Sequence, residues 1–124
     1  MIHEFPVIIY PYRIWILIDK SPSPIGEVFK TYETGDQILF DGYEKILAST
    51  YKVIQRKTNL CGSVIYFSKK SVRLSDVVAH EAVHAAKQCF EHIGADIHPH
   101  EPFEYLVGYI VRCINETRKY KEEI

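Results

Sequence analysis

The hydrophobic pattern of this chain changes its period at Ser75, and this change constrains the fold more than any other feature of the sequence. Before Ser75, short runs rich in Ile, Val and Tyr favour β-strands. After it, apolar residues recur every three or four positions, which is typical of an amphipathic helix. Strands followed by helices predict an α+β fold. We expect one domain over residues 1–124, with a largely antiparallel sheet packed against two C-terminal helices.

The N-terminal half contains several candidate strands. Residues 5–20 are β-rich, and their two prolines predict either an edge strand or two short strands. Residues 27–34 predict another strand, and residues 38–48 predict a short strand followed by a short helix. Residues 50–57 alternate polar and apolar side chains, and with the β-rich residues 63–68 they predict a hairpin.

Two helices are expected after the sheet. Ser75 is the predicted N-cap of the first helix, and Gly94 can end it in the left-handed conformation. The second helix is expected to begin near Glu101, with Pro102 in its first turn, and to fray in the charged C-terminal tail. The predicted apolar stripe of the first helix consists of Val78, Ala82, Ala85, Ala86, Cys89 and Ile93.

The first helix carries the pattern H-E-x-x-H at His80, Glu81 and His84. Histidines four positions apart lie on one helical face, so their ring nitrogens can converge on one metal ion. Zinc suits imidazole ligands, and a neighbouring carboxylate can accept a proton from a water molecule that the ion activates. The pattern predicts His80 and His84 as zinc ligands and Glu81 as the general base. The alternative is a solvated polar face, because both histidines point away from the centre of the apolar stripe.

The segment V-V-A-H-E-A-V-H-A-A, followed by E-P-F-E-Y-L-V-G-Y-I, resembles small gluzincin-type zinc metallopeptidases and is similar to compact H-E-x-x-H proteins of phages and mobile elements. The resemblance covers residues 76–114 and implies a zincin-like domain. It also implies a third zinc ligand at the start of the second helix, with an aromatic residue four positions on, which Glu101 and Tyr105 match. Glu104 is the alternative ligand, although its helical phase would bury Arg112. A histidine, or no third protein ligand, also stays open.

Further candidates concern the substrate. Tyr105 and Tyr109 could contact a substrate or an oxyanion, although packing in the core is the commoner role of a tyrosine. The strand expected at residues 63–68 could pair with an extended substrate, so we expect a zinc-dependent peptidase acting on a peptide or protein. The alternative is a binding or regulatory protein that keeps the zincin scaffold and the metal site without turnover. A chain of 124 residues leaves no second subdomain to wall a deep cleft.

Charge and cysteine content exclude several other classes. The 15 basic and 16 acidic residues nearly cancel, and the sequence holds no Lys/Arg run, so neither nucleic acid nor a membrane is an expected partner. Cys61, Cys89 and Cys113 are widely spaced, which favours buried free thiols. Free thiols indicate a reducing compartment, and the apolar N-terminal stretch lacks a basic leader and a cleavage site. The expected location is therefore the cytoplasm.

Overall fold

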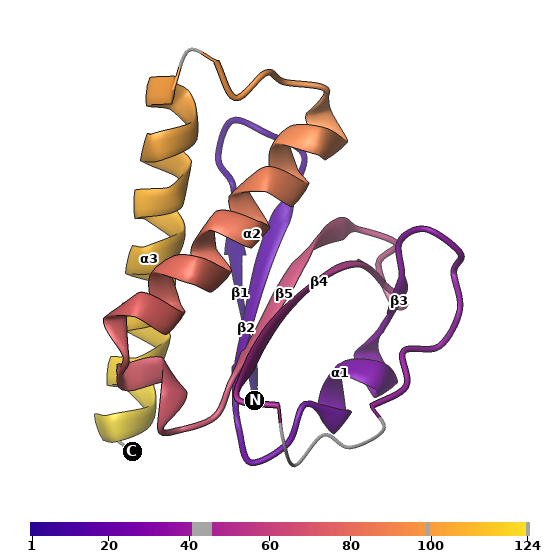
Figure 1. Cartoon of the computed structure of the whole chain (residues 1–124). Coiled ribbons are helices and arrows are strands. Elements are labelled where there is room, and N and C mark those ends of the chain that lie inside the picture. The colour runs from indigo at the N-terminus through magenta and orange to yellow at the C-terminus, as the bar shows by residue number, and fades with distance from the viewer. Residues whose placement is uncertain (41–45, 99, 124) are drawn as a thin grey trace.

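The structure is a computed structural model, and it describes residues 1–40, 46–98 and 100–123. A sheet lies at its centre, and two long helices, α2 (Ser75–Ile93) and α3 (His100–Glu123), cover one face of it (Figure 1). The short helix α1 (Ser23–Val28) packs on the opposite face. The predicted α+β class, with helices at the C-terminus, is confirmed. Within the described residues, no helix is both long enough and apolar enough to cross a membrane.

The sheet has five strands in the order β1-β2-β5-β4-β3. Three of the four neighbouring pairs are antiparallel, and β2 and β5 run parallel. The sheet is therefore mixed, with mostly antiparallel pairing. The strands are β1 (Ile2–Pro6), β2 (Arg13–Ile18), β3 (Phe29–Thr31), β4 (Ala48–Gln55) and β5 (Cys61–Phe67).

The inner strand β2 is buried on both faces because its side chains alternate between two cores. Ile14, Ile16 and Ile18 pack with α2 and α3. Trp15 and Leu17 pack with residues of α1, β3 and β4 on the other face. The sheet thus separates a larger core under the two long helices from a smaller core under α1.

Two of the strand predictions for the N-terminal half are confirmed. The stretch 5–20 contains a break, so that it contributes to β1 and forms β2. The hairpin predicted from residues 50–57 and 63–68 is the pair β4 and β5, whose register pairs Ala48 with Phe67.

Two other predictions for this half are corrected. Residues 27–34 were predicted to form a strand, but they hold the end of α1 and only the three-residue β3. Pro24 lies in the first turn of α1, where a proline favours the start of a helix. In the segment 38–48, residues 38–40 and 46–47 belong to no helix or strand, and β4 begins at Ala48. Residues 41–45 lie outside the described residues.

The helix boundaries follow the predictions in part. Gly94 ends α2 with a φ of 69°, as predicted. The N-cap residue is Leu74 and not Ser75. The predicted fraying of the C-terminal tail is wrong, because α3 continues to Glu123. Its last turns are held by a hydrogen bond from Lys121 to the Ile18 carbonyl and by an Arg73–Glu122 ion pair of 2.8 Å.

Candidate metal centre

The orientation of α2 is set by its buried stripe, which includes Val78 and continues through small residues. Small side chains let the helix approach β4 and β5 closely. Ile93 of the predicted stripe is only partly buried, and Phe90, which the prediction omitted, is buried. The remaining buried members are Ala82, Ala85, Ala86 and Cys89. This orientation leaves the side chains of His80 and His84 exposed, as expected from their helical phase.

The two histidines of the motif converge. The Nε2 atoms of His80 and His84 lie 3.0 Å apart, and their rings meet at 78°. In a tetrahedral zinc site with Zn–N distances of about 2.05 Å, two ligand nitrogens are about 3.3 Å apart. The two nitrogens lie at hydrogen-bonding distance from each other, slightly closer than two ligands of one zinc ion would be.

Glu81 lies between the histidine pair and the sheet. Only 7% of its surface is exposed. Its Oε1 atom accepts a hydrogen bond of 2.8 Å from the hydroxyl group of Thr50 in β4. Its Oε2 atom lies 3.9 Å from Nε2 of His80. One carboxylate oxygen is thus anchored on the sheet, and the other is directed to the histidine pair.

Thr50 is a site residue that the sequence analysis missed. In the sequence it is an ordinary polar member of an alternating strand. Its position beside Glu81 depends on how α2 packs across β4, and this packing cannot be predicted from a local sequence pattern. The only available signal was that Thr50 begins the alternating segment of the predicted hairpin.

A pocket of about 430 Å³ runs beside this part of β4, and we call it the β4 groove. It adjoins the motif through Thr50, which contacts Glu81, and through Gln88, one helical turn beyond His84. Its lining consists of residues 31–34, Ile38, residues 50–52 and Gln88. The groove therefore offers a place for a ligand directly next to the motif.

The strand that borders this groove is β4, and its outer edge is only partly paired. β3 pairs with residues 53–55 of β4, and within the described residues no strand pairs with residues 48–51 on that edge. The prediction that residues 63–68 could receive an extended substrate is wrong. These residues belong to β5, whose two edges are occupied by β2 and β4. An added strand fits the open edge of β4 instead.

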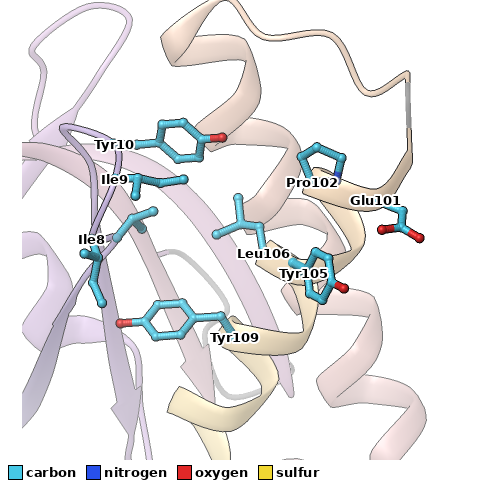
Figure 2. A pocket seen from close by; sticks show the side chains of 9 residues that line it. Ile8, Ile9, Tyr10, Glu101, Pro102, Tyr105, Leu106 and Tyr109 are labelled. Atoms are coloured by element: carbon cyan, nitrogen blue, oxygen red, sulfur yellow. The ribbon is translucent and has the colours of Figure 1, made fainter.

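The predicted third ligand does not join the histidine pair in this structure. Glu101 lines a different pocket, of about 450 Å³, between the start of α3 and the loop that joins β1 to β2 (Figure 2). The alternative ligand, Glu104, shares another pocket with Glu101. All residues that line the pocket at His80 and His84 belong to α2. Across the described part of the chain, no group of three or more His, Cys, Asp or Glu side chains is arranged to hold a metal ion.

The two candidate tyrosines also lie away from the histidine pair, in the pocket that Glu101 lines. Tyr105 is 75% exposed. The hydroxyl group of Tyr109 donates a hydrogen bond of 2.5 Å to the carbonyl of Pro6, and burial raises the pKa of Tyr109 to about 12. Tyr109 therefore ties α3 to the end of β1, which is a structural role.

Comparisons of the chain with protein-family models, with curated proteins and with solved structures find no match. Function is therefore inferred from the geometry itself. That geometry unites an exposed pair of imidazole nitrogens, a buried carboxylate turned toward them and an open strand edge beside both.

Proposed function

We propose that this protein is a zinc-dependent hydrolase of the small gluzincin type, in which His80 and His84 bind the ion and Glu81 is the general base. One observation carries the proposal. The carboxylate of Glu81 is buried and fixed within 3.9 Å of a histidine pair whose nitrogens are 3.0 Å apart. A purely structural metal site needs no such carboxylate beside its first ligand.

The residues divide the chemistry between them. A bound zinc ion supplies a positive charge that polarises the scissile carbonyl group and acidifies the attacking water. Thr50 holds Oε1 of Glu81 as a hydrogen-bond acceptor, which fixes the rotamer of the carboxylate. Oε2 is then free to accept the proton of the attacking water and to pass it to the leaving group.

A peptide is the proposed substrate. Residues 48–51 of β4 have an outer edge without a described partner strand, and backbone N–H and C=O groups on such an edge can pair with an extended main chain. The β4 groove can receive side chains of a peptide bound there. Because Thr50 contacts Glu81, a bound backbone would lie next to the general base.

We propose Glu101 as the third ligand, on the strength of the resemblance to gluzincins. Three protein ligands and one open position make a catalytic zinc site. In this proposal the first turn of α3 approaches the histidine pair when the metal binds. Such a shift would alter the contact of Phe103 with the buried Phe90, whose ring centroids lie 5.4 Å apart.

The experiment that tests catalysis is Glu81→Gln. The amide oxygen can still accept the hydrogen bond of Thr50, but the uncharged amide cannot accept a proton. We expect cleavage of a peptide library, followed by mass spectrometry, to fall at least about 100-fold while the zinc content stays at about one ion per chain. Glu91→Gln, on the exposed face of the same helix, is the matched control and should cleave normally. Equal cleavage by Glu81→Gln and the wild type would remove Glu81 as the base.

The second candidate function is a binding or regulatory protein that retains the metal site. The observation in its favour is that only α2 lines the pocket at the histidine pair. Its signature is stoichiometric zinc without cleavage of any library peptide by the wild type. Such a protein would bind the same peptides equally well with Gln at position 81.

A further inference from the structure

Four basic side chains line one pocket at the end of the molecule where α3 terminates. They are Lys69, Arg73, Arg118 and Lys121, around a volume of about 240 Å³. Two segments supply them, the connection from β5 to α2 and the last turns of α3, which lie side by side in Figure 1 and are joined by an ion pair. We call this site the basic pocket.

The positive charge of the basic pocket is only partly compensated. Its one acidic lining residue, Glu122, pairs with Arg73 at 2.8 Å. Lys69 and Arg118 form no ion pair within the described part of the chain. Four basic and one acidic side chain leave an excess of three positive charges at this pocket, in a chain whose net charge is -1.

The guanidinium group of Arg118 is not fully hydrogen-bonded. Its Nε atom is buried, and no acceptor for it exists among the described residues. A buried donor without an acceptor is unfavourable, and so is the gathering of like charges around one pocket. An anion that bound here would relieve the charge repulsion and accept hydrogen bonds from the guanidinium group of Arg118, which lines the pocket.

We propose that the basic pocket binds the phosphate group of a small phosphorylated molecule. A doubly charged tetrahedral oxyanion matches the charge excess, and arginine side chains offer N–H donors in the geometry that phosphate oxygens accept. The volume of about 240 Å³ suits one phosphate group with a small attached moiety. A nucleic acid would need a track of basic residues along several successive phosphates. This inference is independent of the proposed hydrolase activity.

Inorganic phosphate and a simple phosphate monoester are the probes, titrated into the wild-type protein by calorimetry at low ionic strength. We expect one site per chain with a dissociation constant of about 1 mM or below. Lys69→Gln and Arg118→Gln should each weaken binding at least about tenfold. Their matched controls are the exposed sequence neighbours Lys70→Gln and Lys119→Gln, which remove the same charge outside the pocket and should change binding less than about twofold.

Three results would overturn the proposal. The first is the absence of phosphate binding at 10 mM ligand. The second is an equal loss of affinity in all four variants, which would indicate diffuse electrostatic attraction. The third is tight binding of a single-stranded oligonucleotide that all four substitutions weaken, which would indicate a nucleic-acid surface. Because Lys69 is exposed, we expect the Lys69→Gln variant to fold normally, so a loss of phosphate binding in it cannot be attributed to misfolding. His80→Ala should bind phosphate normally, which separates this pocket from the histidine pair.

Discussion

The hydroxyl group of Thr50 donates a 2.8 Å hydrogen bond to the carboxylate of Glu81 and so joins the partly open strand β4 to the motif helix. The same hydroxyl lies 3.3 Å from the backbone carbonyl of Glu81. The general base of the proposed reaction is therefore positioned by the strand that we propose to receive the substrate. This coupling yields the first prediction.

Thr50→Val should lower turnover with little effect on zinc content. Valine keeps the shape of threonine but leaves one buried oxygen of Glu81 without its donor, which costs about 1–3 kcal/mol in unfolding free energy. We expect turnover to fall about tenfold, because the carboxylate is no longer held toward His80. Thr58→Val, in the exposed turn after β4, is the control. Unchanged peptide cleavage by Thr50→Val would show that the anchor is dispensable.

His80→Ala and His84→Ala should each abolish stoichiometric zinc binding. Either substitution removes one of two converging nitrogens, and the remaining ligands cannot hold the ion against a chelator. Metal analysis after dialysis against a weak chelator measures the effect. His92→Ala, at the other end of α2, should keep its zinc. Full zinc retention in both motif variants would refute the site.

Glu101→Ala should weaken zinc affinity at least about tenfold, whereas Glu104→Ala should change it less than about twofold. The reason is the proposed movement of the first turn of α3 toward the histidine pair. A competitive titration with a fluorescent zinc indicator measures both affinities. Equal affinities in the two variants would mean that the first turn of α3 stays where it is and that α2 alone supplies the protein ligands.

The three thiols should differ sharply in reactivity. Burial raises the pKa of Cys89 to about 12 and that of Cys113 to about 11. Cys61 is only partly buried, although burial raises its pKa as well. At pH 8 we expect Ellman's reagent to modify Cys61 first and to reach the other two thiols only after denaturation. The Cys61→Ser variant should lack the rapid first phase of modification by Ellman's reagent. Three thiols reacting at one rate would contradict the burial of Cys89 and Cys113.

Stability should fall as the solution is acidified below about pH 6.5. Burial, and then the charge of Lys52, lower the pKa of His92 in the folded protein below its usual value of 6.5. The unfolded chain then binds the additional proton first, so the stabilisation is fully present above about pH 6.5 and is lost as the pH falls through the folded pKa. Burial also lowers the pKa of His3, so His3 contributes to the loss of stability at acidic pH in the same way. Between about pH 7.5 and 5.5, the midpoint temperature of thermal unfolding should decrease less for His92→Gln than for the wild type. Parallel curves for the two proteins would exclude His92 as a contributor.

Part of this protein follows from the sequence alone. The helical period after Ser75 places His80 and His84 on one exposed face, because neighbours on a helix are residues three or four positions apart. The left-handed end at Gly94 and the β4–β5 hairpin likewise depend on turns formed by adjacent residues. The short helix α1 is where local reasoning from the sequence fails, because the strand expected at residues 27–34 gives way to the end of a helix whose first turn contains Pro24.

Only the tertiary structure decided the surroundings of the motif. The contact of Thr50 with Glu81, the two occupied edges of β5 and the distance of Glu101 from the histidine pair all depend on how remote segments pack. The basic pocket is a clear case, because Lys69 and Arg118 belong to segments that are far apart in the sequence and meet only in the folded protein. Periodicity and turn chemistry act between near neighbours in the chain. Burial of apolar surface between β-strands and helices, which brings distant residues together, is decided by the shape of the whole core.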